Sequence, residues 1–221
     1  MSGLDFGWLP GAAGDLARGV TTTMMLIVVV TAFGTVLSVA GAAARRSRSR
    51  LLRQAVASYV EVIRNTPFLV QLFFIFFGLP SLGLRLGNVV AAVIAMTLNM
   101  AAYGIEVVRA GLDAVPRGQW EGGTALGLSR YRVFVSVVLP QALRVIFPAL
   151  SSQIIIIMLE SAVVSQIAVR DLTYEADMLQ ARTFRAFETY LVVTLIYLGL
   201  ATLMRRAMQA GAYRWILGGR P

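Results

Sequence analysis

Long uncharged runs dominate the sequence and alternate with short charged stretches. The first run, from Gly19 to Ala44, contains no charged residue and ends in a cluster of arginines. About 20 apolar residues in helical form are enough to cross the hydrocarbon core of a bilayer. Runs of this kind recur along the chain and predict five membrane-spanning helices. We expect them at about residues 20–44, 55–79, 88–105, 140–159 and 187–204.

The second run is interrupted. Asn65-Thr66-Pro67 separates an amphipathic part, which ends near Arg64, from the apolar stretch FLVQLFFIFFGL. Proline has no backbone N–H and its ring collides with the preceding helical turn. The sequence therefore predicts a kink or a new helix start at Pro67. Glu61 and Arg64 are three residues apart, and on a helix this spacing predicts that their charges neutralise each other.

The composition identifies the class of protein. Hydrophobic residues make up 57% of the 221 residues and charged residues only 14%, whereas a soluble domain carries about 25% charged residues. The mean hydropathy is +0.73. We therefore expect an all-α integral membrane protein with a single transmembrane domain over residues 1–221. Cysteine and histidine are absent, which excludes disulfides, Cys/His zinc sites and a histidine general base.

The positive charge indicates the orientation in the membrane. All 20 basic residues are arginines, and with 11 acidic residues they give a formal net charge of +9. They gather at the ends of apolar runs, which suits lipid headgroups rather than a nucleic-acid-binding face. If the spans alternate, residues 45–53, 106–136 and 205–221 share one side with 13 arginines, against five on the other. This predicts an outer N-terminus, a cytoplasmic segment at 106–136 and an inner C-terminus. Residues 1–19 form a mixed leader without the basic start of a secretory signal.

The cytoplasmic segment is the most polar part of the chain. Seven charged residues lie between Ala102 and Ser136, and connections of this length are usually functional or disordered. The glycines at 122, 123 and 127 do not belong to a phosphate-binding loop, because the chain has no lysine and no matching motif. This chain is therefore not expected to bind ATP. On spacing alone, the glycines could equally serve helix–helix contact.

A few polar residues interrupt the predicted spans or lie at their edges. They are Gln71, Asn99, Gln153 and Glu160. Polar groups in such places face the protein interior, where they either join helices or line a solute path. Glu160 is ionisable and lies near the outer end of its span, so it is the best candidate for contact with a polar solute. Arg64 and Arg144 are interpreted as side chains that reach the cytoplasmic interface.

The cytoplasmic segment also resembles a known pattern. Glu121-Gly122-Gly123-x3-Gly127-x9-Val137-x-Leu139-Pro140 is similar to the EAA loop of bacterial ABC importer permeases, E-A-A-x3-G-x9-I-x-L-P. Arg64-Asn65-Thr66-Pro67 with the following apolar stretch, and the flanks Pro116–Glu121 and Leu139–Arg144, resemble the polar amino-acid permease subfamily. The matches cover about residues 55–170 in the expected order.

The resemblance implies a type I importer permease fold in the bacterial cytoplasmic (inner) membrane. The chain would be the permease subunit of an importer for polar amino acids of the histidine, glutamine, arginine or glutamate type, and not an enzyme. ATP and Mg would be bound by a separate ATP-binding subunit, and this chain would bind no cofactor. The other implied partners are a second permease, identical or homologous, an extracytoplasmic substrate-binding protein and membrane lipid. Nucleic acid is not expected.

The resemblance also assigns a coupling role to one group of residues. These are Gln119, Trp120, Glu121, Gly122, Gly123, Ala125, Leu126, Gly127 and Leu128. By analogy Glu121 anchors a helix on the ATPase, Gly127 makes the tight turn behind it, and Leu128, Tyr131 and Pro140 set its angle to the fourth span. Two glycines stand where the pattern has alanines, and each weakens the helix by about 1 kcal/mol.

A second departure concerns the solute pathway. Leu159-Glu160-Ser161 stands where relatives have Lys-Asp/Asn-Ser or Thr, in a region that borders the pathway in the family. A carboxylate there would favour a cationic amino acid. The candidate pathway residues are Gln71, Asn99, Gln153, Glu160 and Ser161. Two alternatives remain: an ion-driven secondary transporter, which usually shows inverted repeats that are not evident here, and a membrane scaffold in which these polar residues only join helices.

Overall fold

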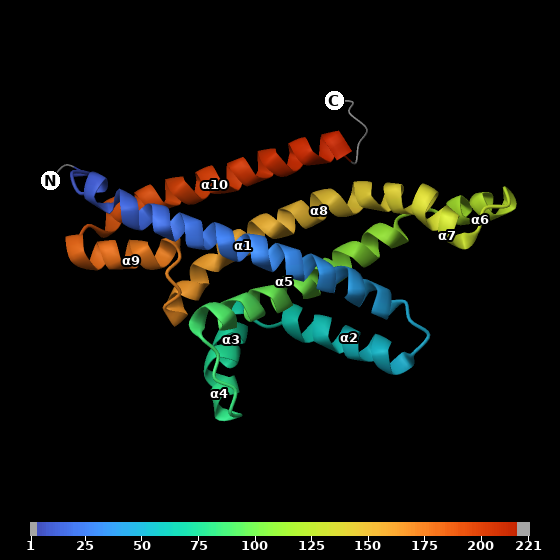
Figure 1. Ribbon diagram of the computed structural model, residues 1–221, viewed down its shortest axis with the longest axis horizontal. Coiled ribbons are helices and arrows are strands. Elements are labelled where there is room, and N and C mark those ends of the chain that lie inside the picture. The colour runs from blue at the N-terminus through green and yellow to red at the C-terminus, as the bar shows by residue number, and fades with distance from the viewer. Residues whose placement is uncertain (1–3, 216–221) are drawn as a thin grey trace.

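The computed structural model describes residues 4–215 and is helical throughout this range, with turns and short connections between the helices (Figure 1). In chain order the elements are α1 (Leu9–Arg45), α2 (Arg50–Arg64), α3 (Phe68–Phe73), η1 (Phe74–Gly78), α4 (Leu79–Ser81), α5 (Asn88–Asp113), α6 (Arg117–Ala125), α7 (Arg130–Val133), η2 (Phe134–Val138), α8 (Leu139–Glu160), η3 (Ser161–Ile167), α9 (Leu172–Thr183) and α10 (Ala186–Trp215). Of the short elements, η1 and η2 are π-helical and η3 is a 3₁₀ helix.

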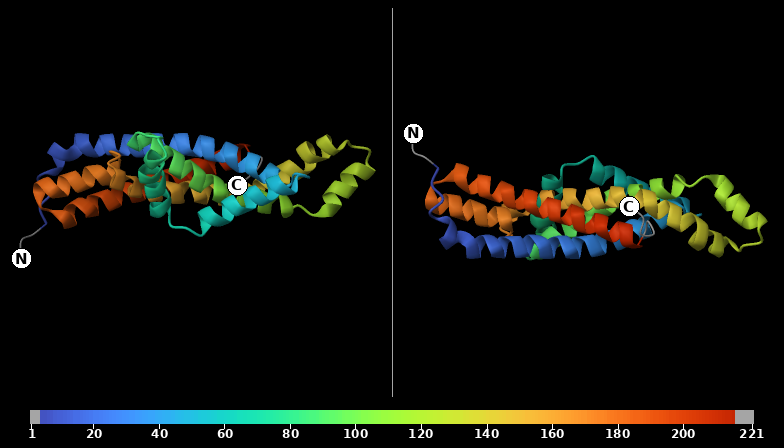
Figure 2. Two further views of the ribbon diagram at one scale, coloured as in Figure 1. Left: turned by 90° about the horizontal axis from the view of Figure 1, so that it is seen from below. Right: turned by 90° about the horizontal axis from the view of Figure 1, so that it is seen from above.

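The molecule is elongated, and α1, α5, α8 and α10 run along its length (Figures 1 and 2). A helical hairpin formed by α6 and α7 lies at one end, which we call the hairpin end. Helix α9 and the start of α1 lie at the opposite end, which we call the α9 end. The short helices α3 and α4 project sideways from the bundle (Figure 1).

Within residues 4–215, four helical stretches are long and apolar enough to cross a membrane. They are Leu9–Arg45, Asn88–Asp113, Arg130–Ile167 and Ala186–Ala212. Arg50–Arg64 and Phe68–Ser81 are long and apolar enough to cross a membrane only when they are taken together. The two helices are bent by 111° at the break between them. The described residues therefore contain four or five candidate spans. The expected second span is not one continuous rod.

Several helices extend beyond the predicted spans. Helix α1 begins at Leu9, so most of the predicted leader is helical. Asp15 and Arg18 interrupt the apolar pattern there, but they pair with each other, while Ala12 and Leu16 on another face pack against α9. Helix α5 likewise continues to Asp113, inside the segment predicted from residue 106 onward. Charge marks where an apolar run ends, but a helix with a packed face can continue past it.

The break at residues 65–67 confirms the predicted new helix start. Asn65 ends α2 by donating from its side-chain Nδ2 to the Glu61 carbonyl oxygen at 2.8 Å, and Pro67 is the N-cap residue of α3. The predicted pairing of Glu61 with Arg64 is wrong. Within residues 4–215 no ion pair joins them. The Arg64 guanidinium instead lies over the ring of Tyr103, 5.3 Å from its centre.

Both π-helical elements come immediately before a Leu-Pro pair. Leu79-Pro80 follows η1 and Leu139-Pro140 follows η2. Proline cannot donate the next helical hydrogen bond, and its ring collides with the carbonyl four residues earlier. The wider π turn accommodates this defect without ending the helix. The helix that was expected to begin at Pro140 therefore runs continuously from Arg130.

Small residues bring α1 and α5 into close contact. A Cβ added at Gly34 of α1 would lie 2.8 Å from Sδ of Met100 on α5, and one added at Gly104 of α5 would overlap Ser38 of α1. In a membrane, apolar side chains gain little by leaving lipid, so helices associate mainly through such close packing. Helix α5 is consequently the most buried of the candidate spans: 61% of its apolar 18-residue stretch is buried.

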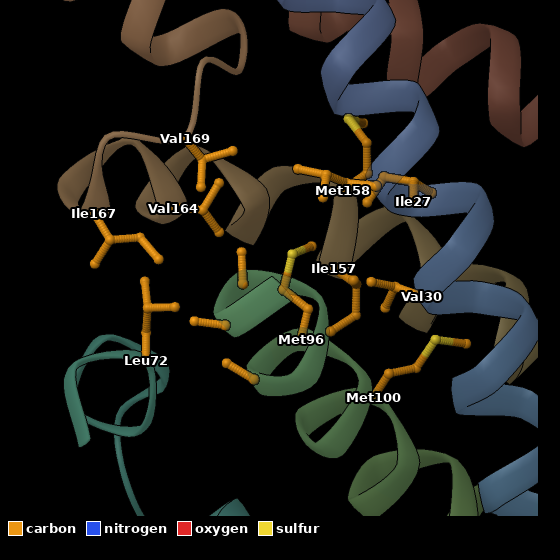
Figure 3. Packing of buried hydrophobic residues seen from close by; sticks show 14 of the residues in the cluster. Ile27, Val30, Leu72, Met96, Met100, Ile157, Met158, Val164, Ile167 and Val169 are labelled. Carbon is orange, nitrogen blue, oxygen red and sulfur yellow. The ribbon is translucent and has the colours of Figure 1, made fainter. Parts of the chain in front are cut away.

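The main hydrophobic core surrounds this contact (Figure 3). Its side chains come from α1, α3, α5, the end of α8 and the η3 segment. Those labelled in the figure are Ile27, Val30, Leu72, Met96, Met100, Ile157, Met158, Val164, Ile167 and Val169. The core thus joins the second part of the bent second span, α3 and η1, to the central helices.

A Schellman motif closes α6. Gly127 has a φ of +78°, its N–H donates to the Thr124 carbonyl oxygen at 3.0 Å, and the Leu128 N–H donates to the Gly123 carbonyl oxygen at 3.2 Å. Glycine adopts this left-handed conformation without steric penalty. The tight turn predicted at Gly127 is confirmed.

The two glycines that follow Glu121 occupy different surroundings. A Cβ at Gly122 would meet nothing within 4 Å. A Cβ at Gly123 would lie 2.7 Å from Cγ2 of Val133 on α7, and valine has little freedom to rotate away. Gly122 therefore only weakens α6, whereas Gly123 allows α6 and α7 to pack closely.

A buried carboxylate fastens α9 at the opposite end. Asp171 has no exposed surface, and its Oδ1 accepts from the Tyr174 N–H at 2.9 Å as the N-cap of α9. The Tyr197 hydroxyl of α10 donates to its Oδ2 at 3.4 Å, and the neighbouring Leu172 N–H donates to Thr23 Oγ1 of α1 at 3.2 Å. Burial raises the pKa of Asp171 to about 7.

The glycine pair supplies a first prediction. Gly122→Ala should stabilise α6 by about 0.5–1 kcal/mol, because alanine loses less backbone entropy than glycine. Gly123→Ala should bring no such gain, since Val133 must move. Amide hydrogen exchange of α6 in detergent measures the difference, with the loop amides of residues 82–87 as an internal reference. Equal protection in both variants would contradict the close α6–α7 contact.

The buried Asp171 supplies a second prediction. Its folded pKa of about 7 lies above the ordinary 3.8, so the folded state holds the proton more tightly and stability falls as pH rises through this window. The midpoint temperature of thermal unfolding in detergent should therefore rise as the pH is lowered from about 8 to about 6. The chain has no histidine to obscure the effect.

Two variants of Asp171 test the cause of this pH dependence. Asp171→Asn keeps a capping oxygen but carries no charge, so its unfolding midpoint should vary much less with pH. Asp171→Ala should lose about 1 kcal/mol of capping over the whole range. If Asp171→Asn kept the wild-type slope, another group would be responsible.

Candidate functional site

The α6–α7 hairpin exposes most of the residues that the sequence pattern assigned to coupling. Glu121 is exposed, Trp120 and Leu128 are half-buried and Gly123 is buried. The remaining exposed members of the set are Gln119, Gly122, Ala125, Leu126 and Gly127. Leu126 is 82% exposed. The hairpin tip therefore presents an uncovered apolar side chain among polar ones.

The inner face of the hairpin fixes it to the bundle. The ring of Trp120 stacks on that of Phe134 with centroids 6.2 Å apart, and Leu128 packs on the same buried cluster. The Gln141 side chain of α8 donates to Gln119 Oε1 of α6 at 3.2 Å. Tyr131 is 75% exposed, so its expected role in setting the hairpin angle is wrong; Trp120 and Phe134 make that contact.

An open cavity of about 670 Å³ separates the hairpin from the ends of α1 and α5. It is lined by Arg46, Leu112, Asp113, Val115, Arg117, Trp120, Glu121, Thr124 and Arg130. Within residues 4–215 the Glu121 carboxylate has no ion-pair partner. An exposed, unpaired carboxylate beside an apolar tip is available to a partner.

A charged network beneath the hairpin was not anticipated. Arg109 of α5 contacts Glu106 at 2.7 Å and Asp113 at 3.1 Å. From α1, Arg46 contacts Asp113 at 2.5 Å and Arg45 approaches Glu106 to 3.9 Å. The spacing of residues 106, 109 and 113 could have indicated the pairs within α5. The partners from α1 depend on how the two helices pack.

Two of the predicted pathway residues meet at the break in the second span. Asn99 Nδ2 of α5 donates to Gln71 Oε1 of α3 at 3.1 Å. The Gln71 amide in turn donates to the carbonyl oxygens of Ile63 at 2.7 Å and Thr66 at 2.9 Å. These bonds satisfy carbonyls that the broken helix leaves unpaired. Gln71 and Asn99 therefore join helices, whatever else they do.

A polar strip continues from this contact along α5. Asn99, Tyr103 and Glu106 are spaced four and three residues apart, which places them on one face of the helix. Beside them lies a cavity of about 440 Å³. It is lined by Arg45, Ala57, Val60, Glu61, Arg64, Asn65, Tyr103 and Glu106. Arg64, which was interpreted as reaching the cytoplasmic interface, thus borders this cavity between α2 and α5.

The other predicted pathway residues lie on or after α8 and are not hydrogen-bonded to this pair within the described residues. Gln153 is buried on α8. The Ser161 hydroxyl donates to the Met158 carbonyl oxygen at 2.7 Å and so serves the local turn. Glu160 ends α8, and its Oε2 is buried without a hydrogen-bond partner in the part of the chain that the structure describes.

Comparisons with known proteins agree on one family. Residues 34–214 match the family described as binding-protein-dependent transport system inner membrane component. The L-cystine transport system permease protein TcyB of Bacillus subtilis is 38% identical over 183 residues, which cover 82% of this chain and 78% of that protein. The arginine transport system permease protein ArtQ of the same organism is 33% identical over 190 residues, covering 86% and 87%.

Solved structures show the same fold. A chain of an amino acid ABC transporter solved with histidines superposes with a TM-score of 0.90 at 33% identity, covering 96% of this chain and all of that one. A chain of the inward-facing MetNI methionine ABC transporter gives a TM-score of 0.76 at 21% identity, which supports the fold alone.

These matches confirm the resemblance drawn from the loop pattern. The family comprises membrane components of transporters rather than enzymes, and its members lie in bacterial inner membranes. Its sequence model covers most of this chain, and relatives above 30% identity cover more than two thirds of it. The chain therefore belongs to the family of inner membrane components of binding-protein-dependent transport systems.

Proposed function

We propose that this chain is the permease subunit of an ATP-driven importer for polar amino acids, and that it forms half of the solute pathway. The observation that carries the proposal is the α6–α7 hairpin, which is rigidly attached on its inner face and uncovered on its outer face. The relatives named for cystine, glutamine and arginine transport support the choice of substrate class.

The hairpin suits docking on an ATP-binding subunit. Exposed apolar side chains ringed by charged ones are typical of protein interfaces, and Leu126 and Tyr131 meet this description beside Glu121 and Arg130. Trp120 and Gln119 connect the same hairpin to η2 and α8. A movement of the docked subunit would therefore be passed to α8 as a rigid-body shift.

The proposed topology has five spans, with the bent pair α2 and α3–α4 as the second. It places the N-terminus outside, and the hairpin and C-terminus in the cytoplasm. The excess of arginines on the hairpin side supports this orientation. Residues 216–221, the end of the basic tail, lie outside the described residues.

The proposed partners are an ATP-binding subunit that carries ATP and Mg, a second permease, an extracytoplasmic substrate-binding protein and membrane lipid. The need for a separate ATPase follows from the lack of lysine and of a phosphate-binding loop in this chain. We propose no cofactor for this chain and no nucleic-acid partner.

We propose that the solute passes the polar residues of the helix bundle, namely Gln71, Asn99, Gln153, Glu160 and Ser161. Glu160 has the strongest support, because a buried carboxylate oxygen without a partner is costly and a cationic solute would provide one. The polar strip through Tyr103 to Glu106 would lead the solute on toward the hairpin end. The substrate would then be an amino acid with a cationic side chain.

Two other functions can be separated from this one by transport measurements in reconstituted vesicles. An ion-driven transporter would take up solute without the ATPase and would stop on addition of an ionophore. A scaffold would move no solute with any partner. The importer requires both the ATPase and ATP.

Charge reversal at Glu121 tests the coupling surface. Glu121→Arg should leave the protein inserted but reduce co-purification of the ATP-binding subunit about tenfold or more, as expected for a central interface residue. Glu188→Arg makes the same change at the α9 end and should leave co-purification unchanged. Wild-type recovery of the ATPase with Glu121→Arg would refute the docking role.

Neutralising Glu160 tests the pathway. Glu160→Gln should raise the half-saturating concentration for a cationic amino acid such as arginine about tenfold, the loss expected for one charge-assisted contact. Uptake of glutamine through the same vesicles should change about twofold or less. Equal effects on both solutes would remove Glu160 from substrate recognition while leaving the coupling proposal intact.

A further inference from the structure

A cavity lined by both polar and apolar side chains lies between α8 and α10 in the half of the bundle nearer the hairpin end. Its volume is about 380 Å³. It is lined by Phe147, Pro148, Ser151, Ser152, Ile155, Arg205, Gln209 and Ala212. We propose that this cavity binds the phosphate group of an anionic phospholipid.

The lining residues gather on two facing helix surfaces. Arg205, Gln209 and Ala212 are four and three residues apart and so share one face of α10. Among the described residues that line the cavity, Arg205 is the single charged one, and it is exposed. Within residues 4–215 it forms no ion pair. The cavity therefore has a net positive charge that nothing in the described chain neutralises.

The available donors match a phosphate. The arginine guanidinium presents a planar fork of N–H groups that binds two phosphate oxygens together, and the Gln209 amide and the Ser151 hydroxyl add neutral donors. The Ser152 hydroxyl already donates to the Pro148 carbonyl oxygen at 3.1 Å. Basic pockets between membrane helices on the cytoplasmic side are known to bind anionic headgroups.

The depth of the cavity favours a lipid over free phosphate. From Glu188 to Arg205 a helix rises about 25 Å, close to the hydrocarbon thickness of about 30 Å. If Glu188 lies near one surface of the membrane, Arg205 therefore lies near the lipid headgroups of the other surface. Exposed leucines continue the same face of α10 toward the α9 end, at Leu198 and Leu191, and offer a track for an acyl chain.

The chain offers a matched pair of variants. Arg206 follows Arg205 at almost the same depth and carries the same charge, but it does not line the cavity. Arg205→Gln and Arg206→Gln therefore remove equal charge from the same membrane level. If the lipid were held only by general attraction to positive charge, both variants would lose it equally. If the cavity binds the phosphate, only Arg205→Gln should lose it.

The experiment is native mass spectrometry of the purified transporter, released from nanodiscs of phosphatidylglycerol mixed with phosphatidylcholine. The wild type and Arg206→Gln should retain phosphatidylglycerol in preference to phosphatidylcholine. Arg205→Gln should retain it about fivefold less, the change expected for one arginine contact. Ser151→Leu fills the cavity without changing charge and should reduce retention similarly. The readout is lipid binding and does not depend on transport.

Three results would overturn the proposal. Equal loss in Arg205→Gln and Arg206→Gln would indicate nonspecific attraction, and displacement of the lipid by millimolar inorganic phosphate would indicate a free-phosphate site. The third concerns the second permease. The chain has no cysteine, so Gln209→Cys introduces a single thiol, and efficient cross-linking of this thiol to the second permease would show that a protein covers the cavity.

Discussion

The close contact between α1 and α5 is the interaction on which the rest of the structure depends. Glycines and a serine let the two backbones approach until a single added Cβ at Gly34 or Gly104 would overlap the opposite helix. Lipid offers apolar side chains nearly the same surroundings as a protein interior, so packing of this kind replaces the hydrophobic drive that holds soluble bundles together. Helices α2, α3 and α8 then pack around α5.

The same arrangement connects the two ends of the molecule. Helix α8 carries Glu160 at one end and continues through η2 into α7 and the hairpin at the other. Trp120 and Gln119 tie the hairpin to this rod, while Arg46 and Asp113 link α1 to α5 beside it. The π turns η1 and η2 come immediately before Leu79-Pro80 and Leu139-Pro140, and π turns are frequent at functional sites.

The polar groups that hold the fold together differ from the candidates for function in the partners that they have. Gln71 and Asp171 use their oxygens and nitrogens to hold a broken helix and a helix N-terminus in place. Glu160 has a buried oxygen without a partner in the described chain, and the exposed Arg205 borders a cavity without a counter-charge there. Such groups are expensive in a membrane, so they indicate where a solute or a lipid would be bound.

The sequence by itself determined the features that depend on residues adjacent in the chain. These are the apolar spans, the helix break at Pro67 and the left-handed turn at Gly127. It also carried the loop pattern that identifies the family. Only the tertiary structure decided that α1 begins at Leu9, that Arg64 lies over Tyr103 rather than beside Glu61, and that Tyr131 is exposed. It likewise distinguished Gly123 from Gly122 and Arg205 from Arg206. The physical reason is that residue type and spacing set the local backbone and the faces of a helix, whereas the neighbour that each face meets depends on how distant helices pack.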